Sequence, residues 1–493
     1  MTGFDHAALD PVALVAGIGA PPTRITADSR QVGPGDAFAA FPGTKADGRA
    51  FIADAIGRGA GVVLWETAGF AWNPAWHVAN RPVGGLRAQL GAIADAIYGH
   101  PSQSLWIVGV TGTNGKTTCT QWIAHCLDRC GRRAAVIGTL GNGLVGALAP
   151  APNTTPDAAL MHETLAGFRA GGAAAVAMEV SSHGLDQGRV NAVAFDVAVF
   201  TNLTRDHLDY HVTMAAYGAA KAKLFAWPGI KACVINADDP FGRHLIDIAR
   251  ASGTPVLSYG FAGGDIRAAA FASTPAGIAL SVATPWGEGE LRAPVIGAFN
   301  AANALAVLGV LLASDVPLAA ALAALAQVEA PPGRMQRLGG GGLPLVVVDY
   351  AHSADALAKA LTALRPWVAP ACELVCVFGC GGDRDTGKRP EMGRAAAELA
   401  DRLVVTSDNP RSEDPAAIAA AVGQGIRATG HRRWSVDLDR ASAIGAVIDG
   451  ARAGDVVLIA GKGHEDYQER DGIRHSFSDA RVAAAALAAW SGA

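Results

Sequence analysis

The sequence predicts an α/β protein of about three domains. At 493 residues the chain is longer than one core can hold, because domains average roughly 150 residues. From residue 105 onward, apolar strand-like segments alternate with amphipathic helical segments, which is typical of a mostly parallel sheet. A second series of this kind follows the Pro-Pro-Gly at residues 331–333, and this predicts a separate domain.

The first part of the chain, residues 1–100, is predicted to form a small α/β domain. Short strand-like segments at residues 36–41 and 61–65 stand on either side of a polar loop at residues 42–49. The chain starts with acidic residues and has no basic segment followed by an apolar run there, so we expect no signal peptide.

The second part, residues 101–331, is predicted to form the central domain. Its expected strands cover residues 105–110, 134–137, 174–179, 195–201 and 232–236. Residues 293–314 carry no charge, but polar and helix-breaking residues interrupt them. The wholly apolar part, residues 304–313, is far shorter than the ~20 residues of a membrane-spanning helix. We therefore expect a buried helix and no membrane span.

The third part, residues 332–493, is predicted to form another α/β domain. Its expected strands cover residues 343–349, 373–378, 403–406 and 456–460. Each strand ends in a polar loop that carries Asp, Arg, His or Asn. Because ligands of such sheets bind beyond the carboxyl ends of the strands, we expect a binding site in these loops.

Composition and charge exclude several classes of protein. Hydrophobic residues make up 50% of the chain and charged residues 17%, which excludes a disordered or fibrous protein. The formal net charge of −4, without a long run of either sign, predicts no nucleic-acid partner. The seven cysteines form no C-x-x-C pair, and most stand in apolar segments, as do Cys372, Cys376 and Cys380. We therefore expect buried reduced thiols and a cytoplasmic protein.

The strongest local pattern is a phosphate-binding loop at residues 109–118, Gly-Val-Thr-Gly-Thr-Asn-Gly-Lys-Thr-Thr. It follows an expected strand and precedes a helix expected over residues 117–129. Backbone N–H groups at the helix start attract phosphates, Lys116 reaches their terminal oxygens, and Thr117 can bind Mg²⁺. Val110 replaces the usual first glycine, so the loop is a variant. The expected nucleotide-binding residues here are Gly112, Thr113, Asn114, Gly115, Lys116, Thr117 and Thr118.

Two further strand ends carry groups that suit a metal ion. Glu179 ends an apolar strand, where a carboxylate can hold Mg²⁺ against nucleotide phosphates. The next strand end, residues 201–211, contains His207, although a histidine cluster in a loop is more often a hydrogen-bonded network than a metal site. Lys221 lies on an expected helix and by default would be a solvated lysine.

These segments together resemble the Mur ligase family, the ATP-dependent amino-acid-adding enzymes of peptidoglycan assembly. The motifs that carry the resemblance stand in the family's order at residues 111–118, 179, 202–209, 297–303, 333–334 and 349–352. Within the family, residues 153–156, 181–185, 379–385, 408–411 and 461–465 resemble the branch that adds meso-diaminopimelate as the third amino acid. The resemblance implies an N-terminal UDP-binding domain, a central ATPase domain and a C-terminal Rossmann-like domain for the amino acid.

The resemblance also implies roles for individual residues. The catalytic positions match Lys116, Glu179, His207 and Lys221. The ligands of two Mg²⁺ ions match Thr117, Glu179, His207 and Lys221, the last as an N6-carboxylysine, a carbamate formed from CO₂. The adenine and ribose positions match Asn303, Arg334 and Asp349. The contacts to the UDP-muramoyl dipeptide match Ser29, Arg30, Asn153, Thr154, Thr155, Ser182, Gln187 and Arg189. The diaminopimelate site matches Arg389, Asp408, Asn409, Pro410, Arg411, Gly461 and Glu465.

The implied reaction starts from ATP, the UDP-muramoyl dipeptide and meso-diaminopimelate. The γ-phosphoryl group passes to the side-chain carboxylate of the D-glutamyl residue, and the amine then displaces phosphate from the acyl phosphate. The implied protein is a cytoplasmic monomer that serves cell-wall growth, cell shape and division. At residues 44–46 Thr-Lys-Ala departs from the His-Gln-Ala of some relatives, in the part that contacts the nucleotide sugar.

Other functions remain open from the sequence. Within enzymes, the runner-up is another ligase of the same superfamily, a lysine-adding version or a folylpolyglutamate synthase. The Asp-Asn-Pro-Arg at residues 408–411 argues against both, because Arg411 can pair with the extra carboxylate of diaminopimelate. A nucleotide-driven switch protein would also carry a phosphate loop. A switch does not need polar loops at every strand end of a second domain, whereas a two-substrate ligase does.

Overall fold

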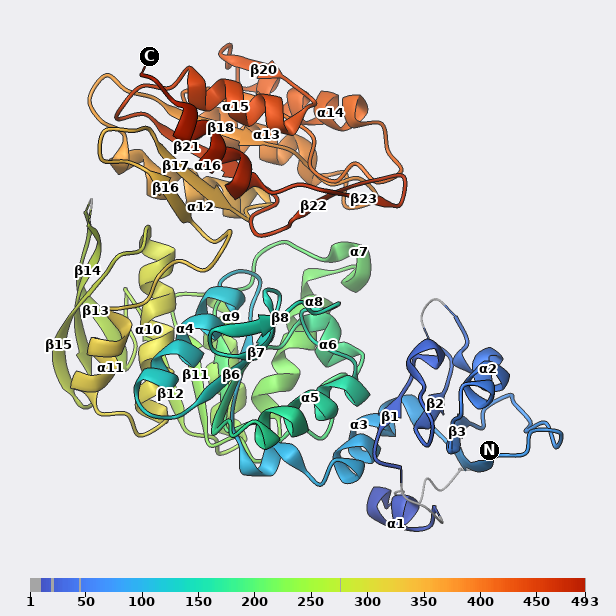
Figure 1. The fold of residues 1–493 in the computed structure, drawn as a ribbon. Helices are drawn as coiled ribbons and strands as arrows, with labels where there is room; N and C mark the ends of the chain where they lie inside the picture. Colours follow the sequence, from blue (N-terminus) through green and yellow to red (C-terminus); the bar gives the residue numbers. More distant parts are fainter. Residues whose placement is uncertain (1–9, 19–21, 44–45, 275, 493) are drawn as a thin grey trace.

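The structure is a computed structural model that describes residues 10–18, 22–43, 46–274 and 276–492. Within these residues the chain forms three domains, each built on its own sheet (Figure 1). This three-domain α/β architecture confirms the predicted fold class, while the predicted limits at residues 100 and 331 stay predictions. Two predictions concern residues outside the described ranges. One is the absence of a signal peptide at the start of the chain, and the other is the departure from the family pattern at Thr44 and Lys45.

A four-stranded parallel sheet, in the order β1-β2-β3-β4, forms the N-terminal domain. Its elements are α1 (Pro11–Ala16), β1 (Ile25–Thr26), β2 (Ala37–Ala40), α2 (Ile52–Gly57), β3 (Val62–Glu66), β4 (Ala79–Val83) and α3 (Leu86–Ile97). The two predicted strands correspond to β2 and β3. An aromatic cluster of Trp65, Phe70, Trp72 and Trp76 packs with Phe38 of β2, which gives this small domain a second apolar layer.

The central domain is built on an eleven-stranded sheet in the order β15-β14-β13-β12-β11-β10-β5-β9-β6-β7-β8. The five predicted strands are present within two residues of their expected ends, as β5 (Trp106–Thr111), β6 (Ala134–Gly138), β9 (Ala175–Glu179), β10 (Val197–Phe200) and β11 (Ala232–Asn236). They form the parallel middle of the sheet. The strands that the prediction missed are β7 (Gly141–Leu144), β8 (Ala147–Ala149), β12 (Val256–Gly260), β13 (Ile266–Thr274), β14 (Gly277–Thr284) and β15 (Gly287–Ala293). Most of them form antiparallel hairpins at the two edges.

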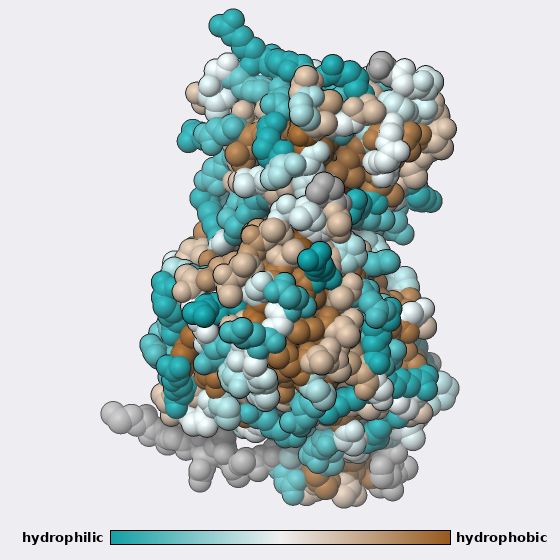
Figure 2. Space-filling model, turned by 90° about the vertical axis from the view of Figure 1, so that its left-hand side faces the viewer, coloured by the Kyte–Doolittle hydropathy of each residue, from teal (hydrophilic) through white to brown (hydrophobic). Residues whose placement is uncertain are grey.

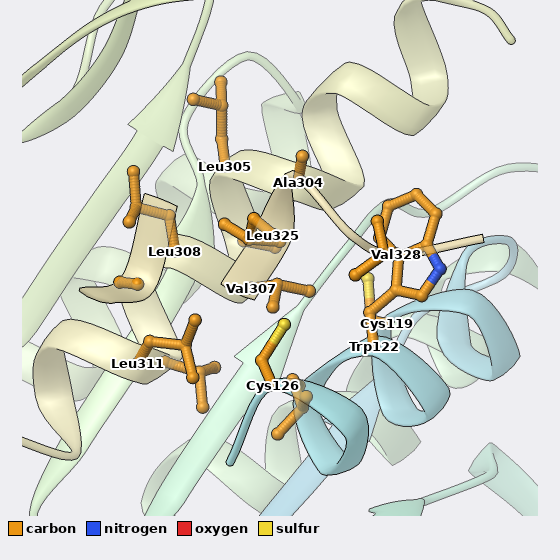
Figure 3. Packing of buried hydrophobic residues seen from close by; sticks show 14 of the residues in the cluster. Cys119, Trp122, Cys126, Ala304, Leu305, Val307, Leu308, Leu311, Leu325 and Val328 are labelled. Carbon is orange, nitrogen blue, oxygen red and sulfur yellow. The ribbon is translucent and has the colours of Figure 1, made fainter. Parts of the chain in front are cut away.

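Helices cover both faces of the central sheet (Figure 1). They are α4 (Lys116–Arg129), α5 (Ala158–Ala170), α6 (Ser182–Asp186), α7 (Leu208–His211), α8 (Met214–Ala222), α9 (Pro240–Ala251), α10 (Ala298–Ala313) and α11 (Leu318–Leu325). Trp122 and Cys126 of α4 share a hydrophobic cluster with Val307 of α10 (Figure 3). The N-terminal domain meets this domain where α3 contacts α5.

The predicted buried helix is α10, and it begins six residues earlier than its apolar part. The polar side chains of the first turns are paired: Asn300 Nδ2 donates to the carbonyl of Ile296, just before the helix, at 2.8 Å, and Asn303 Nδ2 donates to Asn300 Oδ1 at 3.1 Å. Over the described part of the chain, we find no helix whose length and apolar character would let it cross a membrane.

The C-terminal domain contains a six-stranded sheet in the order β16-β17-β21-β18-β19-β20. Its elements are β16 (Gln336–Gly339), β17 (Leu345–Asp349), α12 (Ala354–Leu364), β18 (Leu374–Phe378), α13 (Lys388–Leu399), β19 (Arg402–Val405), α14 (Pro415–Ala428), β20 (Trp434–Val436), α15 (Arg440–Asp449), β21 (Val456–Ala460), the hairpin β22 (Tyr467–Arg470) and β23 (Ile473–Ser476), and α16 (Asp479–Ala489). The first three helices pack on one face, and α15 and α16 pack on the other. All strands except β16 run parallel in this sheet, so the loops after β17, β18, β19 and β21 meet at one edge.

The seven cysteines are all free thiols, and five of them are buried. Cys372 was expected to be buried but is half-buried, because it lies in the loop before β18, where its thiol faces the carbonyl of Ala453 at 3.6 Å. Cys130 is also half-buried. On the face of the molecule in Figure 2, hydrophilic residues are interspersed with smaller hydrophobic areas, and the outline narrows between the C-terminal and central domains.

Candidate active site

The phosphate-binding loop joins β5 to α4 and is shaped by two glycines. Gly112 has a φ of +147°, and a side chain at this position would collide with Thr201 Oγ1. Gly115, directly before α4, has a φ of +86°. Because residues with side chains rarely adopt these backbone conformations, the two glycines allow the loop to turn tightly and direct the first N–H groups of α4 toward an anion.

Lys116 lies in the first turn of α4 and folds back over the loop. Its Nζ donates to the carbonyls of Gly112 at 2.9 Å and Thr113 at 2.8 Å. Burial lowers the pKa of Lys116. The loop is held from the next strand end, where Asn202 Oδ1 accepts from the N–H of Asn114 at 3.0 Å. Lys116 therefore stands where it can reach a terminal phosphate oxygen.

Glu179, at the end of β9, links the phosphate loop to the substrate side. Its carboxylate accepts hydrogen bonds from Thr117 Oγ1 at 3.1 Å and from the backbone N–H of Thr139 at 2.8 Å. The hydroxyl of Thr139 also bonds to Glu179 and lies 3.0 Å from the hydroxyl of Thr154. A continuous polar chain thus runs from the nucleotide loop to a residue predicted to bind the muramoyl dipeptide.

Arg334 reaches the phosphate loop from the C-terminal domain. Its Nη2 donates to Thr117 Oγ1 at 3.1 Å, and its guanidinium carbon lies 4.3 Å from the centre of the Tyr350 ring. Stacking on an aromatic face fixes the direction of a guanidinium group. Arg334 therefore lies beside Thr117 of the loop, and its predicted contact to adenine or ribose stays a prediction.

The other two residues predicted to hold adenine and ribose come from the central and the C-terminal domain. Asn303 of α10 is close to Gly115, since a side chain at Gly115 would come within 2.6 Å of Asn303 Oδ1. Asp349 ends β17, where its carboxylate accepts from the N–H groups of Met335 and Ala351 at 2.7 and 2.8 Å. Burial raises the pKa of Asp349. The structure thus brings both residues to the junction of the two domains.

The donor set at the phosphate loop fits Mg²⁺. Within the described residues, no group of three or more His, Cys, Asp and Glu side chains could hold a metal ion alone. The carboxylate of Glu179 and the hydroxyl of Thr117 are hard oxygen donors 3.1 Å apart. Mg²⁺ typically binds through one or two such donors together with substrate phosphates and water. The residues present therefore suit an ion that arrives with a nucleotide.

Lys221 and His207 lie on the other side of the loop. Lys221 is 1% exposed, and its Nζ donates to the carbonyl of Gly112 at 2.9 Å and lies 4.3 Å from the ring of Tyr217. Burial and the nearby charge of Lys116 hold the pKa of Lys221 well below its usual value. Although 43% of the His207 side chain is exposed, desolvation of its ring and the nearby charge of Lys116 lower the pKa of His207 to about 4, so this imidazole is neutral at pH 7. The default interpretation of Lys221 as a solvated lysine was wrong.

A cavity of about 690 Å³ lies between the central and C-terminal domains. From the central domain it is lined by the predicted site residues Asn153, Thr154, Thr155, Arg189 and His207. From the C-terminal domain it is lined by the predicted site residues Asp408, Asn409, Arg411, Gly461 and Glu465. Groups predicted from two distant parts of the chain to bind two different substrates therefore face one common space.

Several predicted substrate residues do not line this cavity. Ser182 is buried and its hydroxyl lies 2.9 Å from His211 Nε2, while Gln187 accepts from the guanidinium of Arg189 at 2.7 Å. Each side chain thus contacts a neighbouring residue of the central domain, and their predicted contacts to the dipeptide stay predictions. Ser29 and Arg30 belong to the N-terminal domain, where Arg30 is exposed and pairs with the preceding acid. Their predicted contact to uridine stays a prediction.

The loops at residues 379–385, 408–411 and 461–465, predicted to bind the amino acid and called the amino-acid loops below, are braced by contacts of their own. Arg411 donates from Nη1 to the carbonyl of Gly382 at 2.7 Å and lies 3.6 Å from the carboxylate of Glu469. Arg389 is buried and pairs with Glu413 at 2.7 Å, outside the cavity lining. Pro410 is buried as well. Arg411 is thus the predicted cation that faces the cavity, and Arg389 braces the loop that carries it.

The cavity also takes in residues that the sequence did not predict as site residues, such as Arg205, Asp206, Tyr350, His352, Lys388 and Glu391. Two of them tie the domains together, since Arg205 pairs with Glu391 at 3.0 Å and Asp206 lies 3.8 Å from His352 Nε2. The nearby side chains of His352 and His207 help to lower the pKa of Asp206. The sequence could have indicated most of these residues as site residues, because they lie within or next to the motifs at residues 202–209 and 349–352.

The chain matches known proteins along most of its length. Residues 22–98 match the profile described as Mur ligase family, catalytic domain. Residues 110–311 match the Mur ligase middle domain, and residues 333–463 match the Mur ligase, glutamate ligase domain. The three matches follow one another in the same order as the three sheets.

Individual relatives are similar over nearly the full chain. The UDP-N-acetylmuramoyl-L-alanyl-D-glutamate–2,6-diaminopimelate ligase of Chromobacterium violaceum is 52% identical over 98% of this chain and 97% of its own. The Pseudomonas aeruginosa enzyme of the same name is 53% identical over 95% of both chains. A solved structure of a ligase of that name has a TM-score of 0.68 and 38% identity over 95% of both chains. The protein described here belongs to the Mur ligase family.

Proposed function

We propose that this protein is an ATP-dependent ligase that joins meso-2,6-diaminopimelate to the D-glutamyl side-chain carboxylate of UDP-N-acetylmuramoyl-L-alanyl-D-glutamate in peptidoglycan synthesis. The observation that carries the proposal is the common cavity, lined by Thr154 and Arg189 on one side and by Asn409, Arg411 and Glu465 on the other. Both substrates can enter this space, and Thr154 connects it to the phosphate loop through Thr139 and Glu179. The names of relatives at about half identity over the full chain support the same activity.

The first step is transfer of the γ-phosphoryl group of ATP to the carboxylate, which gives an acyl phosphate and ADP. The N–H groups at the start of α4 and the amine of Lys116 bind the phosphates. Thr117 and Glu179 would hold Mg²⁺, which supplies charge neutralisation at the phosphate oxygens when it is bound. Arg334, fixed on Tyr350, adds a second positive charge from the C-terminal domain.

The second step is attack by the amine of diaminopimelate on the acyl carbon. The C–N bond forms, the bond to phosphate breaks, and the amine nitrogen loses a proton. Asn409 and Glu465 can bind the ammonium and carboxylate groups of the amino acid, and Arg411 can form a two-point ion pair with a carboxylate. The contacts of Arg205 and Asp206 with the C-terminal domain hold the two sides of the cavity together and so limit the access of water to the acyl phosphate.

We also propose that Lys221 carries a carbamate. A neutral lysine amine adds CO₂ and loses a proton, which turns a buried amine into a carboxylate-like metal ligand. The burial of Lys221 and its lowered pKa support this, because they raise the fraction of neutral amine at pH 7. His207, whose imidazole is neutral, would serve a second Mg²⁺ nearby.

The remaining parts of the proposal concern regions around the cavity. Residues 1–100 would bind the uridine end of the substrate through Ser29 and Arg30. Residues 101–331 would bind ATP, with Asn303 from this domain and Arg334 and Asp349 from the C-terminal domain beside adenine and ribose. Residues 332–493 would also bring the amino acid. The enzyme would act as a monomer in the cytoplasm. All of its substrates would be small molecules.

The proposal is tested by incubating the protein with ATP, Mg²⁺, UDP-N-acetylmuramoyl-L-alanyl-D-glutamate and candidate amino acids. Mass spectrometry should find the dipeptide substrate extended by one diaminopimelate residue. Phosphate release from ATP should require both the dipeptide and the amino acid. Phosphate release that is independent of either substrate would point to a switch protein instead, and a lysine adduct formed as fast as the diaminopimelate adduct would move the protein to the lysine-adding branch.

A further inference from the structure

Lys462, in the loop after β21, is a fully buried cation that lies between the loops at residues 408–411 and 461–465. It has 0% of its surface exposed and does not line the cavity. Its Nζ lies 3.0 Å from Asn409 Oδ1, 3.0 Å from Glu465 Oε2 and 3.5 Å from Asp408 Oδ1. A single ammonium group therefore contacts three side chains that do line the cavity.

The contact to Asn409 determines which way its amide points. Asn409 Oδ1 accepts from Lys462 Nζ and from the backbone N–H of Glu469, both at 3.0 Å. A flipped amide would present its NH₂ group to these two donors, which cannot accept a hydrogen bond. The NH₂ group instead faces Glu465, to which it donates at 2.8 Å, and its second hydrogen remains available to the cavity.

The contact to Glu465 has a similar effect on a carboxylate. Asn409 Nδ2 and Lys462 Nζ both donate to Oε2 of Glu465, so the other oxygen is the one that can serve a ligand in the cavity. The charge matters as well, because Asp408 and Glu465 bring two carboxylates to one small region. The ammonium of Lys462 balances one of them in a place that water does not reach.

We propose that Lys462 is a positioning residue that fixes Asn409 and Glu465 in the orientation in which they receive the ammonium and carboxylate groups of the amino acid. This rests on the proposed function and deepens it, since it names a residue that controls amino-acid binding without touching the amino acid. A role limited to stability would lower the amount of folded enzyme and leave the affinity for the amino acid unchanged.

The test is steady-state kinetics of the full-length Lys462→Met variant, whose side chain has a similar length and no charge. We expect the KM for meso-diaminopimelate to rise about 10- to 100-fold, the loss that accompanies broken hydrogen bonds to charged groups. The KM values for ATP and the UDP-linked dipeptide should stay within about threefold of the parent. The phosphate loop and Arg189 lie in the other domain, and the contacts of Lys462 are to Asp408, Asn409 and Glu465 rather than to Arg334 or Asp349. Saturating amino acid should restore most of kcat.

A matched control is Arg433→Met, which removes another cation of the same domain. Arg433 pairs with Glu373 at the opposite end of the strands, at 2.7 Å and away from the cavity, so all KM values should stay unchanged. Lys462→Gln serves as a second variant if the first does not fold, since it keeps one donor and should give a smaller rise in the same KM.

Three outcomes would overturn the proposal. One is a folded Lys462 variant with an unchanged KM for the amino acid, and another is a variant in which the KM values of all three substrates rise together. The third is a loss of folding in both variants, which would make Lys462 a structural residue. Failure of the proposed function is separate and visible in the parent protein, which would then form no diaminopimelate adduct.

Discussion

Lys221 in the central domain and Lys462 in the C-terminal domain are equally buried, with 1% and 0% of their surface exposed, but their surroundings are opposite. The amine of Lys221 contacts a backbone carbonyl and an aromatic ring. After burial, the positive charge of Lys116 is the main influence that lowers the pKa of Lys221. The ammonium of Lys462 contacts two carboxylates and an amide oxygen. Burial is the same in both places, and the partners differ.

The difference shows that the two domain edges that face the cavity have different roles. A buried lysine without an acidic partner loses its proton easily and becomes reactive, whereas a buried lysine among carboxylates organises its neighbours. The edge around the phosphate loop is thus suited to chemistry, and the edge around residues 408–411 and 461–465 is suited to recognition. Changes on the first edge should reduce kcat with every amino acid, and changes on the second should alter which amino acid is used.

The largest effect is expected for Lys116→Ala on the chemical edge. Loss of the amine that reaches the terminal phosphate should lower kcat about 10³-fold or more, because preorganised charge is the main source of stabilisation in phosphoryl transfer. The fold should remain intact, since Lys116 contacts only carbonyls of its own loop. Rates of ATP-dependent product formation measure the loss of kcat, and thermal unfolding shows whether the fold is intact. Activity close to that of the parent would remove the phosphate loop from the mechanism.

The next effect is expected for Lys221→Ala, which should lower kcat about 10²- to 10³-fold through loss of a metal-binding group. Acetate or a longer carboxylic acid should restore part of the rate by occupying the site of the carbamate. Lys223→Ala is the matched control, because Lys223 is an exposed neighbour that pairs with Asp186 and should be dispensable. A Lys221→Ala variant that keeps most of its activity would exclude the carbamate and break the comparison between the two lysines.

A smaller effect, on the recognition of the amino acid, is expected for Arg411→Ala. The parent should prefer meso-diaminopimelate over lysine by about 10⁴-fold in kcat/KM, because lysine would leave the guanidinium without its carboxylate partner. The variant should lose about 10²-fold in kcat/KM for diaminopimelate and change little for lysine. Competition between the two amino acids, read by mass spectrometry, gives the ratio directly. Equal use of both by the parent protein would contradict the assignment of this edge.

The smallest effect is expected for Arg205→Ala, which removes a contact between the two edges. Arg205 is half exposed and pairs with Glu391 at 3.0 Å and Asp385 at 3.5 Å. Exposed ion pairs stabilise the contact that they form by up to about 1 kcal/mol. Because this contact joins the two domains, its loss should lower activity at low salt about 2- to 5-fold. The difference from the parent should shrink at high salt, where the pair is screened. A loss that does not depend on salt would mean that Arg205 acts on the substrate instead.

Some of the site could be predicted because its residues are contiguous in sequence. The phosphate loop and the strand ends at Glu179 and Asp349 each combine a strand, a turn and a functional group within a few residues. Residues of the N-terminal domain and the edge hairpins β13 to β15 gave weaker signals, since their strands are short or alternate between buried and exposed positions. The hairpins extend a parallel sheet with antiparallel strands, which the alternation of strands and helices did not indicate.

Other features depend on tertiary contacts that no local pattern encodes. The burial of Lys462 and the position of Arg334 against Thr117 result from loops that meet only in the folded chain. Lys221 offered a partial signal, because it follows Tyr217 by four residues and therefore shares the buried face of α8. A lysine on the apolar face of a helix indicates an unusual environment, although the pattern alone does not identify its partners.

The hairpin of β22 and β23 is joined by its backbone to the loop at residues 408–411, which we propose to select the amino acid. The N–H of Arg411 donates to the carbonyl of Glu469 at 3.0 Å, and the N–H of Asp471 donates to the carbonyl of Arg411 at 2.8 Å. Asp471 and Gly472 form the tight turn of the hairpin, with φ values of +51° and +76°. Ile473, next to this turn, is 60% exposed, so an Ile473→Cys variant would offer a thiol for attaching a fluorescent dye. A dye there would report in real time when the amino acid arrives, without modifying the cavity itself.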